Sequence, residues 1–564
     1  MNNRRGCTVV LGGEAGQGVQ YIESVLVRVA KESGFHVFAD KEYMSRIRGG
    51  INTTVIRIHS ERLQAHVEGI DVLVALNRGV VSRLGDRVGT GTLIIGEESS
   101  LDGREGVAVP FAAIALEIGR KIYANSLALG TVCGLLGIDR DRMANQVGRQ
   151  LSGKGDDVVR ANFLAAARGY DLGVDLRRDK GIDFRMKPAA DVAEHLLLSG
   201  TEALALGALA GGCNAVFAYP MTPGTGVFTQ LAQFSREVDL VVEQVEDEIG
   251  VINMALGAWY AGGRALVTTS GGGFALMTEG VSLAGMIESP VVIHLGQRPG
   301  PATGLPTRTE QGDLNLALYA GHGEFPRIIL APGTIEQCFS FARKAFCLAD
   351  TFQVPVFLLT DQYLVDSIAT VPDFGGDPVE IDHRVVETGE EYRRYRLTAD
   401  GISPRGIPGY GSGSVCVDSD EHDEWGRITE DLDGVRVPMA DKRLRKLDGL
   451  RREALDPELT GDPDYSTLIV GWGSTCGVIR EALAALAVPG LAFLFCPQVW
   501  PLPETVAGHL ARARRIIAIE NNQVGQFADL LQRETGARIA TRILKYNGMP
   551  FAVEELVARI GGEL

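Results

Sequence analysis

The stretch DLVVEQVEDEIGVINMALGAWYAGGRALVTTS, residues 239–270, carries the pattern that decides the fold. DLVVEQ (239–244) is a short apolar run typical of a strand, and small and apolar residues follow from Glu248 over a length that suits a helix. RALVTTS (264–270) is again strand-like. A strand, a helix and a second strand in this order predict two parallel strands of one sheet.

The same alternation of strands and helices continues on both sides of this unit. AVFAYP precedes it, and PVVIHLG, RIILAP and PVFLLTD follow it with helical segments between them. The alternation predicts the α/β class, with three α/β domains and a parallel sheet in the central one. The expected organisation is an α/β domain at 1–180, a linker at 181–195, an α/β domain at 196–375, a polar, irregular excursion at 376–460 and a C-terminal α/β domain at 461–564.

The composition excludes several classes of protein. The 564 residues carry a formal net charge of -16, which argues against nucleic acid as the main partner because no basic surplus neutralises phosphates. No window approaches the ~18 continuous apolar residues of a transmembrane helix, so no membrane partner is expected. The eight cysteines are scattered without a C-x-x-C pair. This favours reduced thiols in a cytoplasmic protein and argues against a metal site on this chain.

Four acidic residues lie in the run EQVEDE (243–248), at the start of the apolar segment that is expected to be a helix. Acids at a helix start are favoured by the helix dipole, each by roughly 0.3–1 kcal/mol. Helical spacing places Asp247 and Glu248 above apolar residues, whereas Glu246 shares a face with Asn253 and two glycines. The pattern leaves Asp247 and Glu248 as candidates for burial, with a plain helix-start role as the alternative.

Two rigid loops follow strands of the central domain. FAYPMTPG (217–224) contains two prolines that stiffen the loop around Thr222, and GQRPG (296–300) places Arg298 just after another strand. Ligands of α/β proteins bind at the carboxyl ends of parallel strands. Thr222 and Arg298 are therefore candidates to share one crevice, and a structural turn threonine and an exposed surface arginine remain the alternatives.

A glycine-rich loop, GGEAGQG (12–18), joins the first predicted strand to a helix in a βαβ pattern at 7–40. Such a loop brings backbone amides to a phosphate, and Asp40 stands where a dinucleotide fold places its ribose-binding acid. The spacing G-x-x-G-x-G, however, is not that of the dinucleotide fingerprint. A ligand-free turn, a phosphate loop and a dinucleotide site all stay open. In the next loop, Arg46 and Arg48 suit either an anion or a solvated turn.

Together the motifs resemble the 2-oxoacid:ferredoxin oxidoreductases, in the form in which a gamma-type domain precedes the alpha-type domain. GGEAGQGV and SRIRGG are similar to the gamma part. The alpha-like motifs are AYPMTPG, EDEIGVINMALGAWYAGGRALVTTSGGGFALMTEG, GQRPGPATGLPTRTEQGDL, ISPRGIPG, EHDEWGRITED, IVGWGST and ENNQVGQ. Two departures are GGG at 271–273 in place of Gly-Pro-Gly and Met-Thr-Pro-Gly at 221–224 in place of Ile-Thr-Pro-Ser. The resemblance implies that the central domain is a thiamine diphosphate pyrimidine-binding module.

The resemblance also implies roles for individual residues. Glu248, nine residues before Gly257, matches the glutamate that hydrogen-bonds N1′ of the cofactor's aminopyrimidine. Thr222 matches the threonine that hydrogen-bonds the substrate, and Arg298 matches the arginine that neutralises the substrate carboxylate. These three are the catalytic candidates.

Further candidates surround this set. Tyr219 and Pro220 are expected to contact the cofactor, and Arg308 and Arg405 are candidates for the second cation that a distal substrate carboxylate needs. The possible coenzyme A contacts are Gly13, Gly16, Gly18, Arg46 and Arg48.

The other half of the cofactor site is missing from the sequence. The chain contains no Gly-Asp-Gly run followed by Asn-Asn, which marks a magnesium–diphosphate site, and no set of clustered cysteines. In the family both lie on a beta subunit. The resemblance thus implies thiamine diphosphate shared with that partner, Mg²⁺ and a 4Fe–4S cluster on the partner, and an (alpha–beta)₂ assembly.

The sequence therefore predicts the alpha subunit of a 2-oxoacid:ferredoxin oxidoreductase with 2-oxoglutarate as the first choice of substrate. The reaction is oxidative decarboxylation to succinyl-CoA and CO₂, with coenzyme A as co-substrate and ferredoxin as electron acceptor, or the reverse carboxylation. A pyruvate, branched-chain or indolepyruvate enzyme of the same family is the first alternative. An NAD(P)-binding oxidoreductase built on residues 7–40 and a non-catalytic binding subunit are alternatives from other classes.

Overall fold

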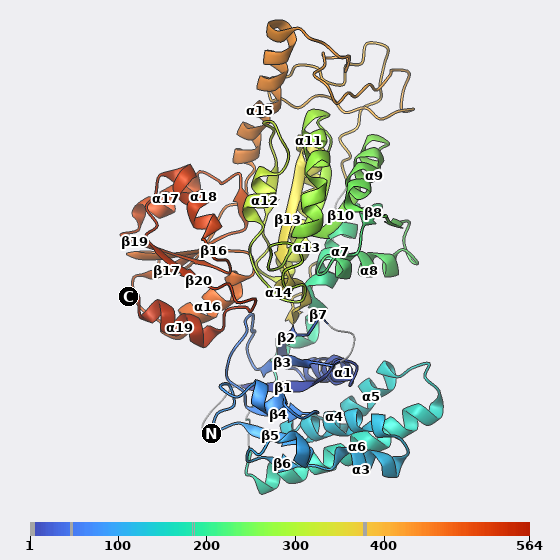
Figure 1. Cartoon of the computed structure of the whole chain (residues 1–564), viewed down its shortest axis with the longest axis vertical. Coiled ribbons are helices and arrows are strands. Elements are labelled where there is room, and N and C mark those ends of the chain that lie inside the picture. Colours follow the sequence, from blue (N-terminus) through green and yellow to red (C-terminus); the bar gives the residue numbers. More distant parts are fainter. Residues whose placement is uncertain (1–5, 46–48, 183, 185, 376–380) are drawn as a thin grey trace. The chain divides into compact units, whose positions relative to one another are not determined.

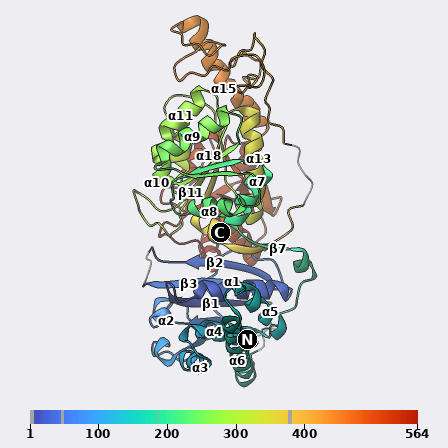
Figure 2. The same cartoon turned by 90° about the vertical axis from the view of Figure 1, so that its right-hand side faces the viewer.

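The structure separates the chain into two compact units, drawn in Figures 1 and 2. The computed structural model describes residues 6–45, 49–182, 184, 186–375 and 381–564. The first unit comprises Met1–Ser199, Asp366–Asp373 and Ala552–Glu554, and the second comprises Gly200–Val365, Phe374–Phe551 and Glu555–Leu564. No helix in the described part of the chain combines the length and apolar character that a membrane crossing requires.

The first unit is built on a mixed sheet, which contains eight strands within the described residues. Its sheet order is β6 (Val107–Ala108), β5 (Leu93–Gly96), β4 (Val72–Ala75), β1 (Gly6–Glu14), β3 (Ile51–His59), β2 (His36–Glu42), β14 (Ile368–Val371) and β7 (Leu196–Ser199). β3 is antiparallel to both β1 and β2 and lies between them. The predicted βαβ unit therefore does not form two neighbouring parallel strands, because the hairpin partner β3 separates them.

Helices cover both faces of this sheet, and alternate residues of each strand supply the two cores. Val9 and Leu11 of β1 pack in the larger core, whereas Val10 belongs to the smaller core on the opposite face. The larger core is formed with α1 (Val19–Glu32), α3 (Phe111–Ile118), α4 (Ala124–Leu136), α5 (Arg140–Gln150) and α6 (Asp156–Asp179), and the smaller with α2 (Val80–Arg83). Short helical turns are η1 (Glu98–Ser100), η2 (Lys121–Tyr123) and η3 (Ala190–Glu194).

The second unit contains the predicted parallel sheet. Its order is β18 (Gln498–Trp500), β12 (Ile328–Leu330), β13 (Pro355–Asp361), β11 (Val291–Gln297), β10 (Ala265–Ser270), β8 (Ala215–Ala218) and β9 (Val241–Gln244). Neighbours are parallel except β12 and β18. β10, β11 and β13 are buried throughout, as expected of strands covered by helices on both faces.

Helices accompany this sheet, and most of them connect its strands. They are α7 (Gly200–Ala210), α8 (Thr225–Phe234), α9 (Glu248–Tyr260), α10 (Gly271–Phe274), η4 (Ala275–Met277), α11 (Thr278–Met286), α12 (Leu314–Tyr319), α13 (Ile335–Phe352) and α14 (Gln362–Asp366). Of these, α7 leads into β8 from β7, and α14 leads from β13 to β14. The positions of the other helices between parallel strands leave the carboxyl ends of the strands at one edge of the sheet, where ligands bind in folds of this kind.

A third sheet belongs to the same compact unit as the parallel sheet. Its order is β15 (Glu458–Gly461), β17 (Leu491–Cys496), β16 (Thr467–Trp472), β19 (Arg515–Glu520) and β20 (Thr541–Leu544). Its helices are α16 (Thr475–Leu486), α17 (Thr505–Arg512), α18 (Gln526–Thr535) and α19 (Val553–Gly561). The predicted α/β class is confirmed, and the described residues form three sheets.

The excursion expected at 376–460 is irregular only in part. Residues 376–380 lie outside the described part of the chain. A π-helical turn, η5 (Leu432–Arg436), leads into α15 (Val437–Arg452), a helix that the sequence pattern did not indicate. The buried residues of α15 are Met439, Lys442, Arg443, Lys446 and Leu450. Because three of the five are charged, the helix lacks the regular apolar spacing by which a buried helix is recognised in a sequence.

Candidate active site

The candidate site lies where adjacent parallel strands end. β9, β8, β10 and β11 are neighbours in the sheet, and the chain leaving each of them carries a predicted functional residue or glycine-rich turn. The guanidinium Nη1 of Arg298 donates a 2.8 Å hydrogen bond to the backbone oxygen of Thr222. The structure thus brings together the two residues that the strand-end argument selected.

Glu248 is the first residue of α9 and is 3% exposed. Asp247 is the N-cap, and its carboxylate accepts a 2.7 Å hydrogen bond from the backbone N–H of Gly250. The Glu248 carboxylate lies against Gly273 and Thr269, so closely that a Cβ at position 273 would overlap both side chains. Its Oε1 is buried and has no hydrogen-bond partner among the described residues.

The loop that carries Thr222 is fixed by a buried polar chain. Thr268 Oγ1 donates to the backbone oxygen of Gly224 over 3.0 Å and contacts Nδ1 of His294 at 2.8 Å. Nε2 of His294 lies 2.8 Å from Thr360 Oγ1. Burial lowers the pKa of His294 to about 3, so the ring is neutral at physiological pH. Sequence reasoning missed His294, although a histidine inside the apolar strand PVVIHLG was a visible signal.

The turn after β10 and the loop after β8 contact each other beside Glu248. The backbone N–H of Gly273 donates to Met221 Sδ over 3.2 Å, which ties the turn after β10 to the loop after β8. Tyr219 and Pro220 are exposed beside this contact. A Cβ added at Gly272 would lie 3.8 Å from Ala302 O and Met221 Sδ, which is ordinary van der Waals contact, so this position tolerates a side chain where 271 and 273 do not.

Segment 308–313, here named the strap, is held by the C-terminal sheet. The backbone N–H of Gln311 donates to Asn521 O over 2.7 Å, its side-chain Nε2 donates to Trp472 O over 2.8 Å, and its Oε1 accepts from Asn521 N–H over 2.9 Å. At its far end, Asp313 N–H donates to Gln297 Oε1 over 3.0 Å, directly before Arg298. The motifs IVGWGST and ENNQVGQ therefore fix a segment that reaches the candidate site.

The two arginines expected to bind a distal carboxylate lie in different surroundings. Arg405 is 4% exposed and pairs with Asp350 at 2.5 Å, and its guanidinium lies over the ring of Trp259. Trp259 is eleven residues along α9 from Glu248, about 17 Å by helical rise. The structure therefore does not bring Arg405 to the crevice. Arg308 lies at the start of the strap, with its Cβ beside Gly548.

The N-terminal glycine loop lies in the first unit. Gly13 is the penultimate residue of β1, and Gly16 and Gly18 have φ values of 83° and 92°, which glycine adopts without strain. Arg46 and Arg48 lie outside the described residues. Asp40 is bound by His66, whose Nδ1 lies 2.9 Å from its Oδ2. This contact and the interposed β3 argue against a dinucleotide site at residues 7–40.

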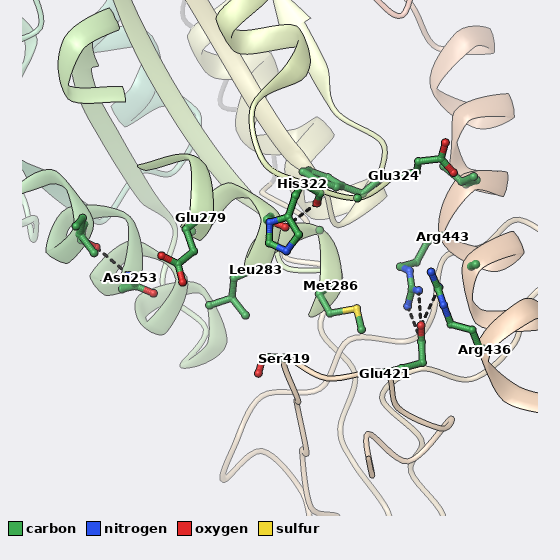
Figure 3. Close-up of a pocket in the computed structure, with 18 residues that line it drawn as sticks. Asn253, Glu279, Leu283, Met286, His322, Glu324, Ser419, Glu421, Arg436 and Arg443 are labelled. Carbon is green, nitrogen blue, oxygen red and sulfur yellow. Dashed lines mark hydrogen bonds and ion pairs between the residues drawn. The ribbon is translucent and has the colours of Figure 1, made fainter. Parts of the chain in front are cut away.

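A separate cavity of about 790 Å³ lies beside the outer face of α9 (Figure 3). It is lined by α9, α11, the loop 322–325 and parts of the segment 419–444. Glu421 faces two of its arginines and accepts from Arg436 at 2.8 Å and from Arg443 at 3.0 Å. Because the lining also carries Glu279 and Glu324, its carboxylates outnumber these two arginines, and the cavity is a poor site for an anionic substrate.

Comparison with known proteins places this geometry in a family. The alpha subunit of a 2-oxoacid:ferredoxin oxidoreductase from a Sulfolobus species is 31% identical over 97% of this chain and 95% of its own length. The chain belongs to the 2-oxoacid:ferredoxin oxidoreductase alpha-subunit family. A family model described as pyruvate flavodoxin/ferredoxin oxidoreductase, thiamine diphosphate-binding, matches residues 206–441 of this alpha subunit, and one described as pyruvate ferredoxin/flavodoxin oxidoreductase matches residues 8–172.

Two further relatives of this alpha subunit act on a named 2-oxoacid. The 2-oxoglutarate oxidoreductase subunit KorA of Mycobacterium tuberculosis is 28% identical over 96% of the chain and 89% of its own length. The 2-oxoglutarate:ferredoxin oxidoreductase of Magnetococcus marinus, solved with 2-oxoglutarate, coenzyme A and succinyl-CoA bound, matches over 100% of both chains with a TM-score of 0.92 and 29% identity.

The candidate site of this alpha subunit fits an aminopyrimidine. The unpartnered Oε1 of Glu248 is a buried acceptor, and Gly273 gives this carboxyl the clearance that a larger residue would remove. Thiamine diphosphate binding is thus in agreement with both the family and the local chemistry of the donor and acceptor groups.

Proposed function

We propose that this chain supplies the pyrimidine half of the thiamine diphosphate site in a 2-oxoglutarate:ferredoxin oxidoreductase. The complex oxidatively decarboxylates 2-oxoglutarate to succinyl-CoA and CO₂ and passes the electrons to ferredoxin, or catalyses the reverse carboxylation. The observation that carries the proposal is the buried carboxylate of Glu248, whose Oε1 is unpartnered beside the glycine triad 271–273.

Glu248 would hold the aminopyrimidine ring through its Oε1 and would carry the proton that is exchanged with a ring nitrogen of the bound cofactor. When bound, thiamine diphosphate supplies the carbon nucleophile and the electron sink for decarboxylation. The carboxylate is fixed because Glu248 begins a helix capped by Asp247 and packs against Thr269. Tyr219 and Pro220, exposed at the end of β8, are the proposed cofactor contacts on the opposite side of the crevice.

Thr222 and Arg298 orient the 2-oxoacid. The Arg298 guanidinium neutralises the carboxylate next to the 2-oxo group by charge-assisted hydrogen bonds, while its bond to Thr222 O keeps the two residues together. Arg308 is the proposed cation for the distal carboxylate, because it belongs to the strap that reaches the site. Arg405 serves structure in this proposal, since its charge is paired with Asp350.

A beta subunit completes the enzyme. It provides the diphosphate half of the cofactor site, Mg²⁺ and a 4Fe–4S cluster, and the assembly is (alpha–beta)₂. The naming of the relatives as alpha subunits supports this partner. So does the apolar surface near Glu248, where Ile249 and Met254 of α9 are 49% and 41% exposed. Coenzyme A is assigned to the Gly13–Gly16–Gly18 loop together with Arg46 and Arg48.

The test uses the chain co-purified with its beta subunit. We expect bleaching of the iron–sulfur absorbance by 2-oxoglutarate and coenzyme A, tested against pyruvate, branched-chain 2-oxoacids and indolepyruvate. If one of these bleaches the cluster instead, the substrate assignment changes to that 2-oxoacid and the enzyme family stays the same. If no 2-oxoacid bleaches the cluster, the function is wrong.

Substitution of Glu248 tests the assigned chemistry. Glu248→Gln keeps the shape but removes the proton-holding carboxylate, so we expect turnover to fall by roughly 10²–10⁴-fold. Glu246→Gln, which changes an exposed acid two residues away, is the matched control and is expected to keep full turnover. Equal turnover of both variants would contradict the role of Glu248 and favour a non-catalytic subunit.

A further inference from the structure

A second carboxyl group, that of Asp313, lies against the first glycine of the triad, whereas Glu248 lies against the last. A Cβ added at Gly271 would lie 2.5 Å from both carboxyl oxygens of Asp313, whereas one added at Gly273 would overlap Glu248. Oδ2 of Asp313 is buried and has no hydrogen-bond partner within the described residues. An unpaired buried carboxyl is costly, so its position calls for a charge or ligand that compensates for it.

The position of Asp313 is fixed on both sides. Its backbone N–H donates to Gln297 Oε1, and Gln297 Nε2 donates to Thr360 O over 3.0 Å, so the residue is tied to the strand that ends in Arg298. On the other side, Gln526 Nε2 donates to Gly312 O over 2.7 Å from the C-terminal sheet. The carboxyl is therefore held beside the crevice by backbone contacts and does not depend on its own side-chain bonds.

Two charged groups act on this carboxyl. Burial and, to a smaller extent, Glu310 on the strap raise the pKa of Asp313, Arg298 opposes them, and the net pKa is about 7. Arg298 is affected in turn, because burial lowers its pKa and Asp313 raises it. Glu248 lies against Gly273, two residues along the triad from the Asp313 contact. Asp313 is thus a carboxyl that interacts electrostatically with Arg298.

We propose that Asp313 is a positioning residue that competes with the 2-oxoacid for Arg298. In the free site its carboxylate offsets the charge of Arg298; when a substrate carboxylate binds that guanidinium, Asp313 takes up one proton from solvent. This proposal rests on the proposed function, because it requires Arg298 to bind a 2-oxoacid. Its consequence is that substrate affinity is linked to pH through a residue that does not touch the reacting carbon.

The sign of the linkage follows from mass action. Below about pH 7 Asp313 is already protonated, so binding takes up no proton and KM is constant. Above about pH 7 the carboxylate must first be protonated, and KM for the 2-oxoacid rises by up to about tenfold per pH unit. Saturating substrate holds Asp313 in its protonated form, so kcat is not expected to follow this titration.

The experiment compares the parent complex with Asp313→Asn between about pH 6 and about pH 9. We expect the parent KM for 2-oxoglutarate to break upward near pH 7 and the variant KM to stay flat, while kcat of each complex shows no break at this pH. Asp448→Asn, which changes an exposed acid on α15, is the control and is expected to keep the parent profile. A break that persists in Asp313→Asn overturns the proposal.

A binding measurement separates this proposal from the proposed function. Calorimetry of 2-oxoglutarate with the Glu248→Gln complex at about pH 8, in two buffers of different ionisation enthalpy, reports the protons taken up. We expect an uptake approaching one proton per site, and close to none when Asp313→Asn is added. Binding without uptake overturns the role of Asp313 alone, whereas absence of binding by every 2-oxoacid in the panel overturns the proposed function and this proposal with it.

Discussion

Glycines 271 and 273 place two carboxyl groups within the same few ångströms of backbone. Glu248 lies against Gly273 and Asp313 against Gly271, and a side chain at either position would occupy the space of a carboxyl. Neither glycine needs a left-handed φ, so each is required for clearance and not for backbone conformation. The glycines, which have no side chain, therefore shape the site as much as the carboxyl groups do.

The clearance at position 273 gives a direct prediction. Gly273→Ala forces its Cβ into Glu248 and Thr269, and a displacement of about 1 Å at a reacting group costs roughly 10²-fold in rate. We expect turnover to fall by that order while the fold is retained, measured by cluster bleaching and circular dichroism. Gly508→Ala, on α17 with no atom within 4 Å of the added Cβ, is the control. Full activity of Gly273→Ala would show that Glu248 is not held where we place it.

Single residues differ in how far the sequence identified them. Thr222 and Arg298 were predictable because each follows a strand of a parallel sheet, and the carboxyl ends of such strands share one edge. Glu248 needed the helical phase and the family resemblance, since Asp247 fitted the burial argument as well. Asp313 could not be selected from the sequence, because its place in the site depends on contact with Gly271, which is 42 residues earlier in the chain.

Helix α15 is held to the parallel-sheet domain by a buried ion cluster. Glu288, 2% exposed, accepts from Lys442 at 2.6 Å and pairs with Lys446 at 2.7 Å. The two lysines are four residues apart and so share one helix face. Burial alone would raise the pKa of Glu288, but the lysine charges outweigh it and lower that pKa well below its usual value.

Removing the shared carboxylate tests this cluster. Glu288→Gln leaves two buried ammonium groups unpaired, so we expect a loss of roughly 3–5 kcal/mol at pH 7. Burial lowers the pKa of Lys442 to about 8 even with Glu288 present, so its folded form binds fewer protons than the unfolded chain at higher pH. The variant should therefore regain stability as pH rises above about 8.

Urea unfolding midpoints at about pH 7 and about pH 9 measure the effect. Glu279→Gln, an exposed acid on α11, is the matched control. In the parent chain the contribution of Glu288 is present above the pKa of an unfolded glutamate and is lost as pH falls below it, because the folded pKa is the lower one. Equal midpoints for the two variants at both pH values would show that the cluster adds no stability.

Strands and helices were predictable from the sequence where their apolar residues follow one regular spacing. The strands and helices of the parallel sheet follow from apolar runs, whereas α15 escaped because lysines occupy its buried face. Strand order could not be predicted for a different reason. β3 is inserted between β1 and β2, and β14 joins the first sheet from more than 300 residues away, and such pairings depend on tertiary contacts that no local pattern encodes.

At the scale of the whole molecule, the C-terminal sheet of the second unit supports the site formed by the parallel sheet. Gln311 bonds to Asn521, 210 residues later in sequence, and to Trp472 at the end of β16. Both contacts are buried, and neither partner touches the crevice itself. The family motifs around Asn521 and Trp472 thus have a structural explanation: they fix the strap that carries Arg308, Glu310 and Asp313.

Loosening the strap tests this coupling. Gln311→Ala leaves Trp472 O and Asn521 N–H without their side-chain partner, and each unpaired buried group costs about 1–3 kcal/mol. Because the strap also positions Arg308 and Asp313, we expect KM for the 2-oxoacid to rise more than kcat falls. Gln233→Ala, which removes an exposed glutamine from α8, is the control. Thermal melting and steady-state assays on the co-purified complex separate the two effects. A lowered melting temperature with an unchanged KM would mean that the C-terminal sheet stabilises the unit but has no part in substrate binding.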